Sequence, residues 1–311
     1  MPKLLVVRLG AMGDILHTIP AVAALRHSFP RAELAWILHP RWMPLVSGLG
    51  LADHLLPFDR RSPLSAFLAL RWLNRFRPDT AIDFQGLLKS GALAWFSSPE
   101  RLWGLAPNFL RESHSALFYT DTCSPLSAHI VDRHLELAAA LGASPAPHLP
   151  QPRGLPEGSL PTEPFVLAAP FAGWASKQWP IQRYMEIGRR LWLEKRLRLV
   201  LNVMPGAPLP SSEFLLRHES GLEGLIDATH RATAVLGLDS GPLHLAAFLG
   251  KPGLALFGPT DPARNGPHGN SIRTLRQPGA PTSYRRHFQI APSMLALDVD
   301  SVWHSLAEVL P

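Results

Sequence analysis

Short apolar segments alternate with longer amphipathic segments along the first half of the chain. Runs rich in aliphatic residues are typical of buried strands, and the longer runs carry apolar residues at helical spacing. Their alternation predicts a doubly wound α/β domain with a parallel sheet over residues 1–143. The expected strands are 3–7, 33–38, 54–58 and 80–84, and the expected helices are 15–26, 63–76, 87–96 and 127–141.

A proline-rich stretch interrupts this pattern at 144–164, where neither a helix interior nor a central strand can form. We interpret it as a linker between two domains. The strand and helix pattern then resumes over 165–292, which predicts a second domain of similar size. Ligands commonly bind in the cleft between two such domains, so we expect the ligand site there. The expected strands are 165–169, 198–203, 234–238 and 253–257, and the expected helices are 181–193, 222–232, 242–249 and 299–310.

Composition narrows the class of protein. Hydrophobic residues make up 46% of 311 residues, which excludes a disordered chain, and charged residues make up only 17%. The net charge of +6 favours an anionic partner, and a single cysteine, Cys123, favours a reducing compartment. No apolar run is long enough to span a membrane, and we expect no secretory signal, although docking on a membrane surface stays open.

Four loops at expected carboxyl ends of strands carry candidate chemistry, because ligands bind at that edge of such sheets. Gly10, Gly13 and Asp14 open the first helix, although Asp14 could simply cap it. Asp239, Ser240, Gly241 and His244 open a later helix whose amides could bind a diphosphate, and an ordinary capped helix is the alternative.

The other two loops belong to the second domain. Lys177 lies between Trp174 and Trp179, which favours a phosphate-facing role over a solvated surface charge. Thr260 lies in a turn rich in Gly and Pro that a purely structural role would also explain. A nucleotide diphosphate in the second domain facing a carboxylate from the first is the arrangement of a sugar transferase. The four loops together therefore indicate this function more strongly than any one of them alone.

Five motifs in this order resemble those of glycosyltransferase family 9, and within it the heptosyltransferases of lipopolysaccharide inner-core synthesis. The resemblance implies a GT-B fold, which is two Rossmann-like domains facing a central cleft. The donor would bind in the C-terminal domain and the acceptor in the N-terminal one, and the segment 293–311 would pack back across the cleft as a helix. The motifs are Arg8-Leu-Gly-Ala-Met-Gly-Asp-Ile-Leu-His17, Asp83-Phe-Gln-Gly-Leu-Leu-Lys-Ser90, Lys177-Gln-Trp-Pro180, Asp239-Ser-Gly-Pro-Leu-His244 and Phe257-Gly-Pro-Thr-Asp-Pro262.

The resemblance also implies an activity, which is inverting transfer of heptose from ADP-L-glycero-D-manno-heptose to Kdo on lipid A, with no cofactor and no metal. Asp14 matches the general base and Lys177 the lysine that neutralises the departing diphosphate. Residues implied in donor binding are Gly173, Lys177, Asp239, Ser240, Gly241, His244 and Thr260, and those implied in acceptor binding are Gly13, Arg60, Arg61, Lys89 and Arg111.

Two positions depart from the family pattern. Pro210 stands where an acidic residue near the donor is usual, and Ser220 stands near the position at which the family contacts adenine through a methionine. A different nucleotide sugar or acceptor therefore stays open, as do a nucleotide-sugar epimerase and a non-catalytic nucleotide-sugar binder. A Ser-His-Asp hydrolase is disfavoured because the Gly-x-Ser-x-Gly elbow is absent. We expect a cytoplasmic protein on the inner face of the cytoplasmic membrane, with an anionic glycolipid and no nucleic acid as partner.

Overall fold

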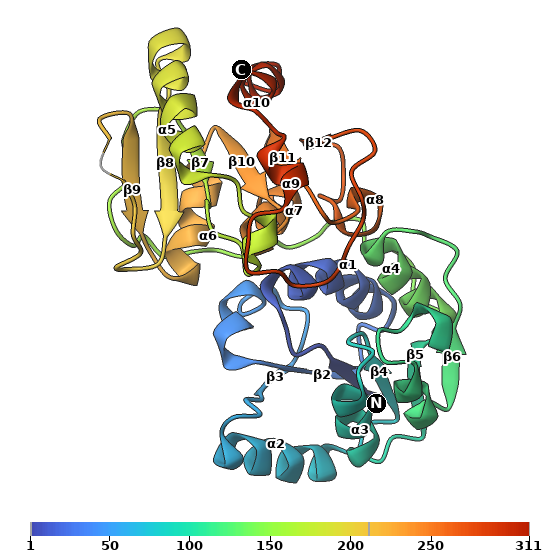
Figure 1. Ribbon diagram of the computed structural model, residues 1–311. Helices are drawn as coiled ribbons and strands as arrows, with labels where there is room; N and C mark the ends of the chain where they lie inside the picture. The colour runs from blue at the N-terminus through green and yellow to red at the C-terminus, as the bar shows by residue number, and fades with distance from the viewer. Residues whose placement is uncertain (1, 211, 311) are drawn as a thin grey trace. The chain divides into compact units, whose positions relative to one another are not determined.

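The computed structural model describes residues 2–210 and 212–310, and the chain divides into two compact units, 1–152 and 153–311. Each unit is built on a parallel sheet of six strands with helices on its faces (Figure 1). Both sheets have the strand order of a Rossmann fold, in which the first strand of the unit lies in the middle and the order reverses beside it. The predicted α/β class with two doubly wound parallel sheets is thus confirmed.

The first unit has the sheet order β3-β2-β1-β4-β5-β6. Helices α1 and α4 pack together, and α2 and α3 pack together on the opposite face of the sheet (Figure 1). The strands are β1 (Lys3–Val7), β2 (Glu33–Leu38), β3 (His54–Pro57), β4 (Thr80–Asp83), β5 (Arg101–Leu105) and β6 (Asp121–Cys123); the helices are α1 (Met12–Ser28), α2 (Pro63–Phe76), α3 (Leu88–Phe96) and α4 (Ile130–Ala140), with 3₁₀ turns η1 (Pro40–Leu45), η2 (Pro107–Phe109) and η3 (Ser113–Phe118).

The second unit repeats this order as β9-β8-β7-β10-β11-β12. Its strands are β7 (Phe165–Ala168), β8 (Arg198–Val203), β9 (Leu215–Glu219), β10 (Ala234–Leu238), β11 (Gly253–Phe257) and β12 (Ile272–Arg276). Its helices are α5 (Ile181–Arg190), α6 (Leu222–Arg231), α7 (Gly241–Phe248), α8 (Pro262–Asn265), α9 (Pro292–Leu295) and α10 (Val299–Ala307), and the turn η4 (Ala175–Lys177) precedes α5.

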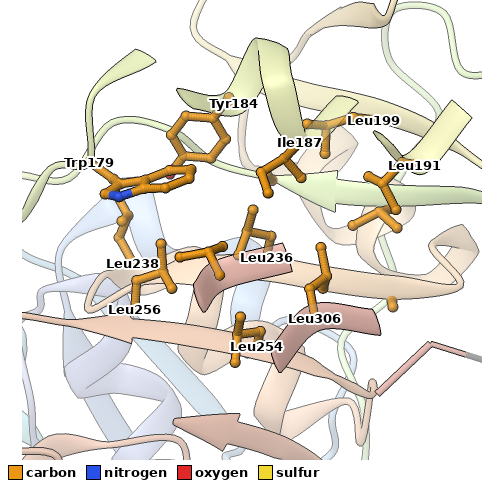
Figure 2. Packing of buried hydrophobic residues seen from close by; sticks show 14 of the residues in the cluster. Trp179, Tyr184, Ile187, Leu191, Leu199, Leu236, Leu238, Leu254, Leu256 and Leu306 are labelled. Carbon is orange, nitrogen blue, oxygen red and sulfur yellow. The ribbon is translucent and has the colours of Figure 1, made fainter. Parts of the chain in front are cut away.

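Aliphatic side chains of the central strands form the core of the second unit. Figure 2 shows the rings of Trp179 and Tyr184 side by side next to leucines of β10 and β11. The two rings meet edge to face at 5.1 Å between centroids, an arrangement that aromatic pairs prefer. Helix α10 covers the same core through Val302 and Leu306 and contacts α5. The packing of segment 293–311 back across the cleft stays a prediction.

The predicted strands are all present, and four further strands were not predicted. Strands 33–38, 198–203, 234–238 and 253–257 have the predicted bounds. The additional strands β5, β6, β9 and β12 carry polar or charged residues on several positions, and three of them lie at a sheet edge. An edge strand is less completely buried than a central one, so its sequence lacks the continuous apolar run that identifies the others.

The predicted linker is divided between the two units, and its second half packs on α6. Glu157 Oε2 accepts a hydrogen bond of 2.6 Å from the backbone N–H of Gly221, the residue that precedes α6, where the helix dipole favours a negative charge. A side chain at Gly154 would come within 2.1 Å of the Glu223 carbonyl oxygen. The segment from Arg153 onward is therefore a packed part of the second unit.

Among the described residues, no helix is both long enough and apolar enough to cross a membrane.

Candidate active site

The Asp14 carboxylate lies at the carboxyl end of β1, in the first turn of α1. Its Oδ2 accepts a hydrogen bond of 2.9 Å from the N–H of Ala11, the residue at the helix start, so Asp14 does cap the helix. Its other oxygen, Oδ1, lies 2.9 Å from an Arg8 guanidinium nitrogen, and the side chain remains 38% exposed. Capping and a reactive role are therefore compatible, because the carboxylate is oriented by two contacts and is still open to a ligand.

Arg8 is the residue that fixes Asp14, and the sequence analysis did not single it out. Its side chain is buried at the end of β1, and a second guanidinium nitrogen donates to the backbone carbonyl of Phe84 beyond β4. A buried charge is costly unless it is paired and hydrogen-bonded. Arg8 therefore ties the carboxyl ends of two neighbouring strands to the carboxylate, and a lone arginine at the end of an apolar strand is the signal that could have revealed it.

The motif that begins at Asp83 organises the neighbouring turn. Asp83 is buried and accepts hydrogen bonds of 2.8 Å from the hydroxyls of Ser90 and Tyr119 and from the N–H of Gln85. Burial raises the pKa of the Asp83 carboxyl, although these donors act against the increase. The Gln85 side chain accepts a bond of 2.9 Å from the Leu9 N–H, so this turn holds the loop that leads to Asp14.

The predicted acceptor residues all follow strands of the first sheet at the carboxyl edge that carries Asp14. Gly13 is buried in α1, whereas Arg60 and Arg61 are exposed after β3, and Lys89 and Arg111 are exposed after β4 and β5. Because β3 and β5 each lie two strands, or about 10 Å, from β1, the loops that carry Arg60, Arg61 and Arg111 leave the sheet on either side of the strand that leads to Asp14.

The loops that carry Lys89 and Arg111 are joined to each other. Glu112, next to Arg111, accepts a hydrogen bond of 2.8 Å from the N–H of Leu88 at the start of α3. Their side chains therefore extend from connected parts of one edge, which suits a ligand that carries several negative charges.

In the second unit, Lys177 lies at the centre of a polar cluster at the carboxyl edge. Its ammonium is 2.5 Å from Asp239 Oδ2, and Asp239 lies at the end of the neighbouring strand β10. Thr260, after β11, donates to the same oxygen at 2.5 Å, and His244 Nε2 lies 3.6 Å from the other oxygen. The structure thus brings together four of the predicted donor residues from three adjacent strands.

Asp239 serves this cluster as a buried anion. Burial by itself would raise the pKa of Asp239, but the His244 ring and the Lys177 ammonium hold it well below its usual range. The carboxylate therefore stays ionised beside the Lys177 side chain. The side chains of Asp239 and Thr260 are buried and bonded to each other, and Asp239 also binds Lys177, so they hold the lysine in position. Their direct contact with a donor stays a prediction.

Aromatic residues fix the loop that carries Lys177. The Lys177 ammonium lies 4.3 Å from the centroid of the Trp174 ring, which a cation favours. Two residues later, Trp179 is buried in the core and donates a bond of 2.8 Å to the Leu297 carbonyl. The exposed Arg286 approaches the same Trp174 ring at 5.4 Å, a second cation that sequence reasoning missed.

The start of α7 lies at the same carboxyl edge. Ser240 precedes the helix and turns its hydroxyl to the Leu238 carbonyl, and Gly241 is the first helical residue. The first N–H groups of a helix have no partner within the helix and carry the positive end of its dipole.

The predicted donor residue Gly173 lies apart from this cluster. It is exposed, and a side chain there would meet nothing within 4 Å.

The two positions that depart from the family pattern lie on the β8 and β9 side of this sheet. Ser220 follows β9 and is buried, and its hydroxyl accepts a bond of 2.6 Å from the Asn202 amide. Pro210 is half-buried in the loop between β8 and β9. Neither side chain adds a charge near the carboxyl edge.

Two Rossmann-like units, with a fixed carboxylate at the carboxyl edge of the first sheet and a lysine beside a helix start at that of the second, have the architecture of a GT-B glycosyltransferase. Residues 69–290 match the sequence model of glycosyltransferase family 9 (heptosyltransferase). The chain belongs to this family.

Individual relatives agree with this assignment. Lipopolysaccharide heptosyltransferase 1 of Pseudomonas aeruginosa is 28% identical over 86% of this chain and 82% of its own length. The enzyme of the same name from Escherichia coli K12 is 28% identical over 89% of this chain and 94% of its own. The solved structure of E. coli heptosyltransferase WaaC with ADP has the same fold, with a TM-score of 0.79 at 23% identity over 98% of this chain and 99% of that one.

Proposed function

We propose that this glycosyltransferase moves heptose from ADP-L-glycero-D-manno-heptose to a Kdo sugar of lipid A in lipopolysaccharide inner-core synthesis. The relatives that match most of its length are named lipopolysaccharide heptosyltransferase 1, and one matching structure holds ADP. The observation that carries the proposal furthest is the oriented, accessible Asp14 carboxylate at the carboxyl edge of the first sheet.

In the proposed reaction, Asp14 is the general base. An acceptor hydroxyl oxygen attacks the anomeric carbon of the heptose, and its proton passes to the Asp14 carboxylate. The bond between the anomeric carbon and the diphosphate oxygen breaks, and its electron pair leaves with ADP. A base must lie within hydrogen-bond reach of the proton it removes, which requires a carboxylate with a fixed orientation. Arg8 and the Ala11 N–H provide that orientation.

Lys177 stabilises the departing diphosphate in this scheme. Its ammonium carries three N–H donors, and the bond to Asp239 uses one of them. The remaining donors, together with the first amides of α7, would face a phosphate group. Preorganised donors of this kind stabilise developing charge without reorganising during the reaction, and they usually make the largest contribution to catalysis.

Attack opposite the leaving group inverts the anomeric centre, and these protein groups supply the base and the counter-charges without a metal. Both features are part of the proposal. NMR of the product fixes the anomeric configuration, and turnover in excess EDTA tests whether a metal is needed. Retention of configuration, or loss of turnover that Mg²⁺ restores, would contradict this part of the scheme.

We also propose a site of action at the inner face of the cytoplasmic membrane. Lipid A is anchored in a bilayer, and the basic residues Arg60, Arg61, Lys89 and Arg111 at the first edge are suited to its phosphates and to the Kdo carboxylates.

A transfer assay tests the proposed substrates. Purified protein is incubated with ADP-heptose and Kdo-lipid A, and mass spectrometry is used to detect addition of one heptose. Calorimetric titration with ADP, UDP and GDP addresses the departures at Pro210 and Ser220, and tight binding of ADP alone is expected. Preference for UDP or GDP would indicate a family member with another donor. Donor binding without transfer to any Kdo acceptor would favour a nucleotide-sugar binder.

A further inference from the structure

Helix α2 exposes apolar side chains on the face that points away from the core. Ala69, Leu73 and Phe76 form its buried side. On the opposite side, Leu64, Phe67 and Leu68 are 66%, 59% and 53% exposed. Residues spaced three and four apart share one face of a helix, so these three side chains form a continuous patch with Arg71 and Arg75 beyond them. We call these five residues the α2 face.

The α2 face lies within a strongly basic segment. Residues 60–78 contain no acidic residue and include Arg60, Arg61, Arg71, Arg75 and Arg77, all of them exposed. Among residues 2–210 and 212–310, none of these arginines takes part in an ion pair.

The carboxylates at the two ends of this segment already have partners. Asp59 accepts a hydrogen bond from the Arg61 N–H, and Asp79 accepts one from the Lys3 N–H. In the part of the chain that the structure describes, neither carboxylate forms an ion pair with an arginine of this segment, so these guanidinium groups are available to an anionic partner.

We propose that the α2 face docks on the surface of an anionic phospholipid bilayer. Helices that lie in a membrane interface present apolar side chains to the acyl boundary and basic side chains to the headgroups, and the α2 face combines both. Leu64, Phe67 and Leu68 enter the interface, and Arg71 and Arg75 meet lipid phosphates. This inference deepens the proposed function, on which it rests for the membrane-anchored acceptor.

The position of α2 connects this surface with the candidate active site. The helix begins after β3, directly beyond Arg60 and Arg61, at the same carboxyl edge that carries Asp14. A bilayer against the first turns of α2 therefore lies beside that edge. A glycolipid whose sugars project from the membrane would reach the edge without leaving the bilayer.

A second copy of the chain fits the α2 face less well. A symmetric dimer through this face would bring the arginines of both copies into one interface to which the α2 face contributes no carboxylate. Like charges in such contacts are unfavourable. An anionic bilayer instead pairs every arginine with a phosphate, so the charge pattern favours lipid over self-association.

Vesicle flotation tests the proposal without any need for activity. The full-length protein is mixed with vesicles of phosphatidylglycerol and phosphatidylcholine, or of phosphatidylcholine alone. We expect binding to the anionic vesicles that weakens as salt increases. The variants L64S/F67S/L68S and R71Q/R75Q should each bind at least about tenfold more weakly, because every basic residue and every inserted apolar side chain contributes.

A matched control replaces leucines that are at least half exposed elsewhere, as L126S/L155S/L193S, and should bind like the natural protein. Thermal melting and light scattering accompany each variant. Wild-type protein that ignores anionic vesicles at low salt would overturn the proposal, as would equal loss of binding in the control. Concentration-dependent dimers that only the α2-face variants abolish would assign the face to a second copy instead.

An activity comparison separates this inference from the proposed function. The α2-face variants should transfer heptose to a water-soluble, deacylated Kdo acceptor at the natural rate, yet be at least about tenfold slower on acceptor embedded in anionic vesicles. Normal rates on both acceptors would overturn membrane docking and leave the transferase function intact. Absence of transfer by the natural protein to either acceptor would instead contradict the proposed function.

Discussion

Replacing Arg8 with methionine removes the guanidinium that orients Asp14 while keeping the apolar part of the side chain. Two contacts disappear, one to Asp14 Oδ1 and one to the Phe84 carbonyl. The half-exposed Asp14 can be rehydrated, but the carbonyl loses a buried partner, and each such loss costs about 1–3 kcal/mol. We therefore expect a loss of about 1–3 kcal/mol in the free energy of unfolding.

The larger effect of this substitution is on turnover. Without Arg8 the Asp14 side chain keeps its cap to Ala11 but can rotate, and small misplacements of a reacting group can cost about 100-fold in rate. We expect kcat to decrease by about 10–100-fold, while the KM for ADP-heptose stays within about twofold, because the donor groups belong to the second unit. Arg8→Lys should restore part of kcat, since an ammonium can hold Asp14 but lacks the fork that also reaches Phe84.

Steady-state kinetics with a soluble Kdo acceptor measures this split between kcat and KM. Arg26→Met is the matched control, because Arg26 lies at the other end of α1 and bonds to Leu51, Ala32 and Asp53. The control should lose stability and keep kcat. An Arg8→Met enzyme with normal kcat, or with kcat and donor KM altered together, would refute the positioning role.

Three further predictions follow from the site and its surroundings. Lys177→Ala should raise the donor KM and lower kcat by at least about 100-fold, because diphosphate neutralisation is lost; an unchanged donor KM would argue against this role. Burial and the nearby Arg8 charge lower the pKa of His134 to about 3. In the unfolded chain this histidine gains a proton below about pH 6.5, whereas in the folded protein it stays neutral. Between pH 7.5 and pH 5 the free energy of unfolding of the natural protein should therefore decrease by about 2 kcal/mol more than that of His134→Gln, which denaturant melts at both pH values measure. Gly10→Ala should destabilise the first unit, because Gly10 has a φ of +146° and an added Cβ would lie 2.5 Å from Trp42 Nε1; an unchanged melting temperature would contradict this packing.

The central strands could be predicted because each is a short continuous apolar run, as parallel strands buried on both faces require. β12 illustrates the limit of such reasoning. Its sequence, Ile-Arg-Thr-Leu-Arg, is neither a continuous apolar run nor an alternating one, so the strand is recognised only by its pairing with β11 in the folded chain. The segment after Arg153 was predicted as a linker for its prolines, and its packing on α6 depends on Glu157 meeting a helix start distant in sequence.

The sequence was sufficient to locate most of the candidate site residues, but not the contacts between them. Asp14 and Lys177 could be placed because loops after parallel strands gather at one edge. The pairing of Arg8 with Asp14 depends on backbone directions at the end of β1, and the role of Gln85 depends on a bond between the loops that follow β1 and β4. The ion pair between Asp239 and Lys177 is likewise a contact that the order of the motifs does not contain, and direct contact of Asp239 with a donor stays a prediction.

The central claim is that Asp14 is the base of a heptosyl transfer that Lys177 assists. Asp14→Asn tests it most directly, because an asparagine side-chain oxygen can still accept the Ala11 N–H that caps α1. The measurement is single-turnover formation of heptosylated Kdo acceptor from ADP-heptose, together with calorimetric donor affinity. We expect a loss of at least about 1,000-fold in rate, with donor affinity and melting temperature close to those of the natural protein. Near-normal transfer by Asp14→Asn would contradict it.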